Sequence, residues 1–129
     1  MKKILLGIFF YLLFNGLVFA RHDAVWLKAS NEINKTLPSQ HTQDLILDNT
    51  FYVDGTFVNN FSSIYKKSEI NPIILKNYKT SAKKIITNNV CSTPLYKKML
   101  IDGVTVKYII YGKEGLLLTI IILSISDCS

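Results

Sequence analysis

Both cysteines of this chain lie in its carboxyl-terminal part, and strongly apolar residues separate them. The stretch from Cys91 to Cys128 reads as a helix end followed by two apolar strands around a glycine-containing turn. An even cysteine count favours a disulfide if the chain is exported. Closing a loop of this size would stabilise the fold by roughly 3–4 kcal/mol, against roughly 5–15 kcal/mol for a whole small domain. We therefore expect Cys91 and Cys128 to be bonded; the alternative is two buried free thiols in a cytosolic protein.

The amino-terminal end has the layout of a secretory signal peptide. Two lysines precede an apolar run from Ile4 to Phe14, and small residues follow up to Ala20. The run is shorter than the roughly 20 apolar residues of a spanning helix. We expect cleavage after Ala20, which would leave residues 21–129 as a single small domain, periplasmic or secreted. The alternative is that residues 1–20 are kept as an uncleaved anchor.

The charge of the mature chain is mildly basic and spread out. Removing the two lysines of the leader lowers the formal net charge from +6 to +4. The remaining lysines form separate pairs rather than a tract, which is typical of a solvated surface. We therefore expect no nucleic-acid partner.

The amino-terminal half of the mature chain predicts one helix and one β-hairpin. Apolar residues spaced four apart, beginning at Val25, predict a helix from Asp23 to Thr36, with Asp23 as its cap and Trp26 packed against the sheet. Residues 45–53 and 56–65 read as strands, and Asp54-Gly55 between them is a strong two-residue turn signal. The alternation of the second strand is irregular, so we expect a bulge or an early strand end there.

The carboxyl-terminal half predicts two helices and a second hairpin. Asn71-Pro72 starts a helix that we expect to fray at Asn88-Asn89, and Thr93-Pro94 starts a shorter one. The first of these helices has an apolar stripe at helical spacing, formed by Ile74, Tyr78, Ala82, Ile85 and Ile86. Residues 104–111 and 116–125 then read as strands. The fold class that follows is α+β: an antiparallel sheet of four to five strands packed by two main helices, with one disulfide.

No constellation of catalytic or metal-binding residues can be recognised. His22 and His41 are isolated, which leaves no metal-ligand spacing. Asp44, Asp48 and Asp54 are spread over a strand and its turn, where exposed structural carboxylates are the ordinary case. We therefore expect no enzyme, no cofactor and no small-molecule substrate; an undetected hydrolase is the alternative.

A pattern around the cysteines resembles a known family. Its carboxyl-terminal part runs Cys91-x-x-Pro94-x-x-Lys97-x-Met99-Leu100-x-x-Gly103 and ends in Asp127-Cys128, and its upstream part is Asn34-x-Thr36-Leu37-Pro38. From Ile33 to Cys128 the chain resembles the α/β type of type II secretion pilotin. The resemblance implies a small periplasmic protein in which Cys91 and Cys128 form the structural disulfide. It also implies binding to a segment at the C-terminus of a secretin, escort of that secretin to the outer membrane, and ring assembly.

One feature of the family is missing. Such pilotins carry a lipid on a cysteine at the cleavage site, where this chain has Ala20-Arg21. The first hypothesis is therefore a soluble, pilotin-like binding module for a secretin or another envelope secretion component. The alternative is a small secreted protein of another role, an effector or an inhibitor, and a protruding loop at Gly112 to Gly115 would favour it.

Overall fold

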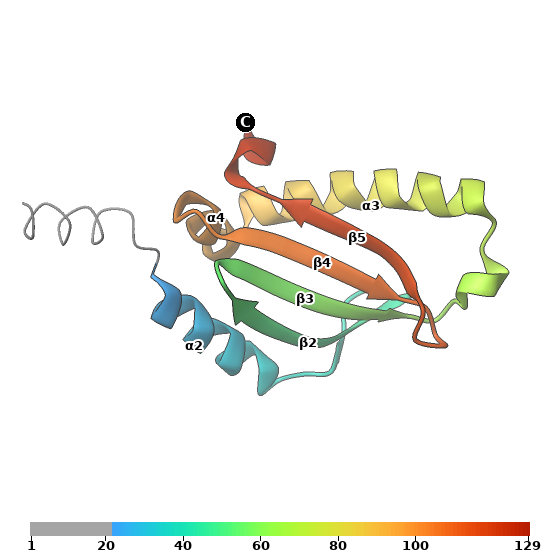
Figure 1. Ribbon diagram of the computed structural model, residues 1–129, viewed down its shortest axis with the longest axis horizontal. Coiled ribbons are helices and arrows are strands. Elements are labelled where there is room, and N and C mark those ends of the chain that lie inside the picture. The colour runs from blue at the N-terminus through green and yellow to red at the C-terminus, as the bar shows by residue number, and fades with distance from the viewer. Residues whose placement is uncertain (1–21) are drawn as a thin grey trace, which may run out of the picture.

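The computed structural model describes residues 22–129 (Figure 1), so the expected leader and its cleavage site lie outside the described residues. In chain order the elements are α2 (Asp23–Asn34), β1 (Ser39–Gln40), β2 (Leu45–Val53), β3 (Thr56–Ser63), η1 (Lys67–Glu69), α3 (Pro72–Ser92), α4 (Pro94–Ile101), β4 (Thr105–Tyr111), β5 (Leu117–Leu123) and η2 (Ile125–Cys128). The α+β class, the five strands and the single disulfide are as expected from the sequence. Among the described residues, no helix is both long and apolar enough to span a membrane.

The sheet has the strand order β1-β2-β3-β4-β5 and is mixed rather than purely antiparallel. All neighbouring strands are antiparallel except β3 and β4, which are parallel. The cause is the long connection through α3 and α4, which carries the chain back along the sheet before β4 begins (Figure 1). The expectation of a purely antiparallel sheet is therefore wrong for one pair of strands. Each hairpin makes its own two strands antiparallel, but the pairing between the hairpins, of β3 with β4, depends on the connection.

The first hairpin turns where the sequence predicts it. Asp54 and Gly55 both have positive φ (47° and 77°), as a two-residue hairpin turn requires. Of the two irregularities expected in the second strand, the early end is found, because β3 stops at Ser63. The register shift lies instead in β2, between Leu47 and Asn49.

The three α-helices of the described residues, α2, α3 and α4, lie on the same face of the sheet. Phe57, Asn59 and Phe61 of β3 alternate toward this face, and Tyr96 of α4 contacts both Phe57 and Asn59. The same face of β2 presents Thr50, whose hydroxyl is bonded to the Ser30 hydroxyl of α2 (2.9 Å). No helix of residues 22–129 lies on the opposite face, where Phe51, Val53 and Ile122 are exposed.

The disulfide connects the end of α3 to the carboxyl terminus. Cys91 is bonded to Cys128 of η2, 37 residues later, with a Cα–Cα distance of 5.5 Å. The sequence suggested that the helix frays at Asn88-Asn89, but α3 continues to Ser92. Two contacts explain the difference: Val90 in this last turn is fully buried in the core, and Cys91 is held by its bond to η2.

The inward face of α2 is turned by one residue from the predicted stripe. Val25 is 53% exposed, whereas Trp26 is 6% exposed and belongs to the core. The N-cap residue is His22, whose side chain makes no capping hydrogen bond to the helix. Asp23, expected to be the cap, instead accepts a hydrogen bond from the Tyr52 hydroxyl. Trp26 determines which face of α2 points inward, because its ring packs in the core beside α4. Residues near Trp26 in the sequence do not indicate this contact.

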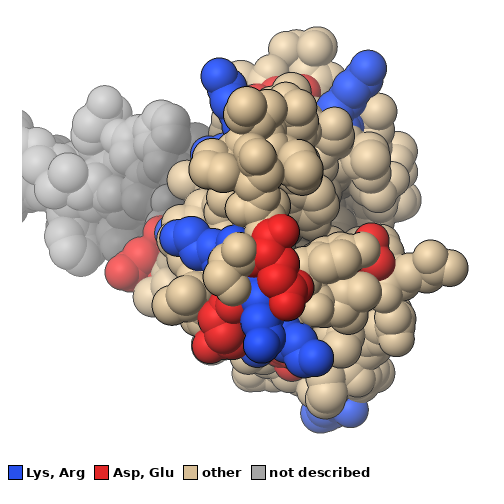
Figure 2. Space-filling model, turned by 90° about the vertical axis from the view of Figure 1, so that its right-hand side faces the viewer, with Lys and Arg blue, Asp and Glu red and all other residues tan. Residues whose placement is uncertain are grey.

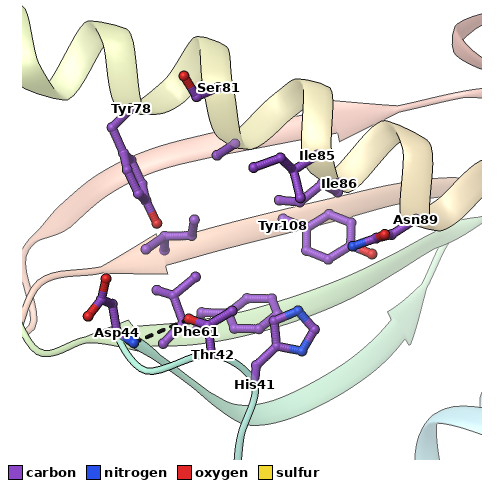
Figure 3. A pocket seen from close by; sticks show the side chains of 13 residues that line it. His41, Thr42, Asp44, Phe61, Tyr78, Ser81, Ile85, Ile86, Asn89 and Tyr108 are labelled. Carbon is purple, nitrogen blue, oxygen red and sulfur yellow. Dashed lines mark hydrogen bonds between the residues drawn. The ribbon is translucent and has the colours of Figure 1, made fainter.

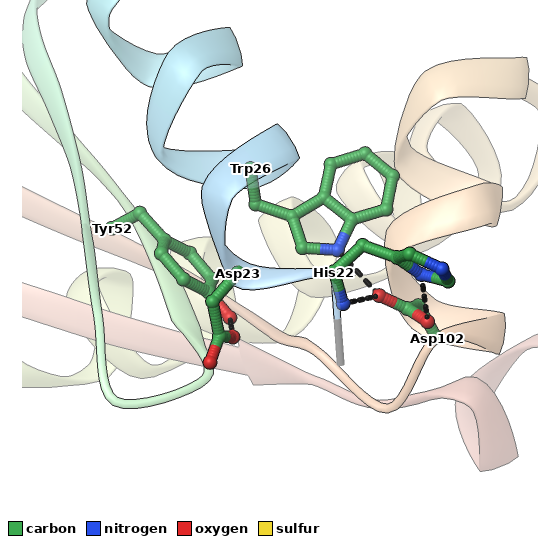
Figure 4. A network of polar contacts seen from close by, with 5 residues as sticks. All are labelled: His22, Asp23, Trp26, Tyr52 and Asp102. Carbon is green, nitrogen blue, oxygen red and sulfur yellow. Dashed lines mark hydrogen bonds and ion pairs between the residues drawn. The ribbon is translucent and has the colours of Figure 1, made fainter. Parts of the chain in front are cut away.

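Asp102, just after α4, is the polar link between α4 and α2 (Figure 4). Its Oδ2 accepts hydrogen bonds from the Trp26 indole N–H (2.7 Å) and the His22 backbone N–H (2.8 Å). Its Oδ1 lies 2.8 Å from His22 Nδ1. Burial raises the pKa of Asp102, but the hydrogen bonds from His22 and Trp26 outweigh it, so the pKa lies below its ordinary value of 3.8.

Replacing Asp102 with alanine is expected to lower the free energy of unfolding by about 1–3 kcal/mol, because the buried indole N–H of Trp26 loses its acceptor. Urea denaturation of the two proteins measures the effect. Glu32→Ala is the matched control, since Glu32 is exposed and forms an ion pair with the exposed Lys35, and it should change stability by less than about 0.5 kcal/mol. Equal effects of the two substitutions would show that the Asp102 contacts contribute nothing.

The stabilisation by Asp102 is also expected to depend on pH. A carboxylate whose pKa is lowered in the folded state stabilises the fold fully above its unfolded pKa, here near 3.8. This stabilisation is lost as the pH falls through the lower pKa of the folded state. The stability difference between the wild type and Asp102→Asn should therefore be constant near neutral pH and shrink below pH 3.8. Unfolding curves recorded at several pH values measure it, and a difference that persists at the lowest pH would contradict the account.

Candidate binding groove

An apolar groove runs between α3 and the helix-bearing face of the sheet (Figure 3). One part of it is a cavity of about 280 Å³, the first cavity of the groove. The floor is formed by strand residues, one wall by α3 and the other by the loop before β2. The lining residues are His41, Thr42, Asp44, Leu45, Phe61, Tyr78, Ser81, Ala82, Ile85, Ile86, Asn89, Tyr108 and Ile110.

A second cavity, of about 360 Å³, extends the groove toward the start of α3. The two cavities share Asp44 and Tyr78, and Ile74 lines the second one. From Ile74 to Asn89 the helix rises about 22 Å at 1.5 Å per residue, so the groove is long enough for about four turns of a ligand helix.

The groove exists because none of the described elements covers the sheet between α3 and the loop before β2. α2 packs over β2, and α4 is short and covers only the other end of β3 and β4, beside Phe57 and Asn59. The stripe predicted on α3 is present with the expected spacing, but only part of it is buried. Ile74 and Ile85 are 62% and 61% exposed, so they are available for a partner.

The groove is mostly apolar, and its charged lining residues are two carboxylates, Asp44 of both cavities and Glu69 of the second. Burial raises the pKa of Tyr78, and the nearby Asp44 carboxylate raises it further. The pKa of Tyr108 is raised by burial and by Tyr96, so these phenols stay protonated at neutral pH. Such a surface is suited to binding apolar side chains.

The residues considered for catalysis are not brought together. Asp44 lies at the groove rim, whereas Asp48 accepts a hydrogen bond from Ser62 at the β2 irregularity. His41 is exposed, and its ring lies edge-on to Phe61, with 5.2 Å between centroids. His22 lies beside Asp102, 80 positions away in sequence, so no local pattern could have indicated that pair. Within residues 22–129, no group of three His, Cys, Asp or Glu side chains could hold a metal ion.

The loop considered as an inhibitory element is fastened to the body of the protein. In the turn between β4 and β5, the Lys113 N–H donates to the Tyr65 carbonyl (2.9 Å). Glu114 Oε1 accepts from the Lys67 N–H (2.8 Å). At this end of the molecule, charged side chains of both signs are interspersed in one cluster (Figure 2). The turn therefore lacks the free protrusion that would favour an inhibitor.

Comparisons with known proteins identify the fold. No protein-family model matches the chain, and no curated protein matches it in sequence. A protein of Pseudomonas aeruginosa described as secreted has a similar structure, with a TM-score of 0.69 and 15% identity over 83% of this chain and 92% of that one. The pilotin of the Vibrio vulnificus type 2 secretion system has a TM-score of 0.69 and 10% identity, covering 83% and 91%. The type II secretion pilotin of Vibrio cholerae has a TM-score of 0.64 and 10% identity, covering 82% and 91%. The chain thus has the fold of these pilotins.

Proposed function

We propose that this protein is an exported, non-enzymatic binding module that binds the C-terminal segment of a secretin, or of another envelope secretion component, and helps it to localise or assemble. The open apolar groove along α3 is the observation that carries the proposal. The fold shared with two type II secretion pilotins supports the choice of partner.

The shape and chemistry of the groove favour an amphipathic helix as the ligand. Its length along α3 matches about four helical turns, and its apolar floor suits residues spaced three and four apart on one helix face. Asp44 is the charged group shared by both cavities, so a basic residue beside the apolar face of the ligand would complement it.

Export and the mature chain of residues 21–129, cleaved after Ala20, are part of the proposal. The disulfide supports export, because such bonds persist in oxidising compartments. Both cysteines of the chain are in that bond, so neither can carry a lipid. We therefore propose that this protein acts as a soluble periplasmic carrier and brings its partner to the membrane without a lipid on either cysteine.

Capture from the native envelope tests the choice of partner. Tagged residues 21–129 should retain a secretin, identified by mass spectrometry, and a variant with the groove blocked by Ala82→Arg should not. Ala82 lines the first cavity from α3, so a long charged side chain there would occupy the space of the ligand. Recovery of a different protein, or of the secretin by both proteins, would count against the proposal and favour another exported role.

A further inference from the structure

The outer edge of β5 is open for strand pairing. β5 is the last strand of the sheet, and its seven residues, LLTIIIL, include no charge and no proline. In an antiparallel pair, alternate residues direct their N–H and C=O groups away from the partner strand. Among the described residues, the backbone of β5 has no hydrogen bond to any segment other than β4. Such an edge is a template for an added strand.

The outer edge of β2, at the opposite side of the sheet, is partly covered by the chain itself. The short β1 covers the start of β2. Further along, the Asn34 side chain covers Thr50: its Nδ2 donates to the Thr50 carbonyl and its Oδ1 accepts from the Thr50 N–H, both at 2.7 Å. Within residues 22–129, the chain therefore covers part of the β2 edge with its own groups and forms no backbone hydrogen bond along the β5 edge.

A cavity of about 480 Å³ lies beside this edge, between β5 and α3. Four consecutive residues of β5, 117–120, line it opposite α3. The pairing with β4 shifts register here, because Leu117 pairs with Tyr111 and Thr119 with Ile110, so Leu118 is an extra residue in β5. Thr119 is 6% exposed, and its hydroxyl has no hydrogen-bond partner among the described residues. Leu75, Lys76 and Lys79 line the helix side, so this is a different face of α3 from the one that lines the groove.

The charge of α3 indicates which strand would fit. The helix contains four lysines and no acidic residue, and none of these lysines is in an ion pair within the described part of the chain. Two of them, Lys76 and Lys79, border the cavity. A second copy paired through β5 would bring two such helices together and be opposed by like charges. A peptide with carboxylates would be attracted instead.

We propose that the β5 edge binds an extended acidic peptide, which adds a sixth strand beside β5 with its carboxylates next to Lys76 and Lys79. Backbone hydrogen bonds to β5 would supply affinity, and the lysines would select for acidic side chains. This site is separate from the groove and does not depend on the identity of the groove ligand.

Fluorescence anisotropy with a labelled octapeptide of alternating valine and glutamate tests the proposal on the intact mature protein. Binding is expected, and lysine in place of glutamate should abolish it. N-methylation of alternate peptide bonds should also abolish it, because it removes the donors needed for strand pairing. Lys76→Glu/Lys79→Glu should weaken binding at least tenfold. The matched variant Lys83→Glu/Lys84→Glu, on the same helix but outside the cavity lining, should change it less than threefold.

Three results would overturn the proposal. The first is no binding of the acidic peptide at millimolar concentration. The second is equal binding of the N-methylated peptide, which would mean that charge alone attracts it. The third is a stable dimer in sedimentation whose amide exchange shows protection at β5, since a second copy would then occupy the edge.

Discussion

Replacing Cys91 and Cys128 with serine is expected to lower the free energy of unfolding by roughly 3–4 kcal/mol, because the unfolded chain regains the entropy that the closed loop removes. The loop contains α4, β4 and β5, so the constraint acts on most of the carboxyl-terminal half. For a total free energy of unfolding near the low end of the usual range of about 5–15 kcal/mol, this loss is more than half of the stability of the domain. Urea denaturation under oxidising conditions measures the difference.

Reduction provides the control for this prediction. Wild-type protein in reductant should unfold at the same urea concentration as the Cys91→Ser/Cys128→Ser variant, and reductant should leave the variant unchanged. If the midpoint of the wild type did not respond to reductant, the bond would contribute nothing to stability in solution.

Placing a charge in the groove is expected to weaken ligand binding at least tenfold, about 1.4 kcal/mol, without unfolding the protein. Ile85→Glu introduces a carboxylate where apolar ligand side chains would bury it. Ile85 is 61% exposed in the free protein, so its replacement should cost little stability. Titration with a synthetic peptide of the secretin C-terminal segment measures the affinity.

Ile73→Glu is the matched control for this substitution. Ile73 lies on the same helix and is 70% exposed, but it lines neither cavity of the groove. It should bind the peptide as the wild type does. Equal losses in the two variants would indicate a general effect of charge on α3 rather than an effect of the groove.

Features with local causes could be predicted from the sequence. The turn at Asp54-Gly55 and the start of α3 at Asn71-Pro72 depend on residues next to each other, and both are found as expected. Asn71 Oδ1 accepts the Ile73 N–H at 2.8 Å, as a helix cap should.

Features with distant causes could not be predicted in the same way. The rotation of α2 depends on Trp26 meeting Asp102, 76 positions later. The parallel pairing of β3 and β4 depends on where the two intervening helices return the chain.

The groove could be predicted from the sequence only in part. The apolar stripe of α3 was visible in the sequence, but its spacing is the same whether the stripe is buried or faces a cleft. Only the position of α3 relative to Phe61 and Tyr108 leaves Ile85 exposed. The open edge of β5 is similar, because an apolar strand reads alike at the centre and at the edge of a sheet.

The central claim, that the groove along α3 binds the secretin segment, is tested most directly by amide chemical shifts recorded while that peptide is added to the labelled mature protein. The account predicts shifts concentrated along the groove, at Tyr78, Ala82 and Ile86 of α3 and at Phe61 and Tyr108 of the floor. Shifts that are absent, or that are confined to β5 and the uncovered sheet face, would contradict it.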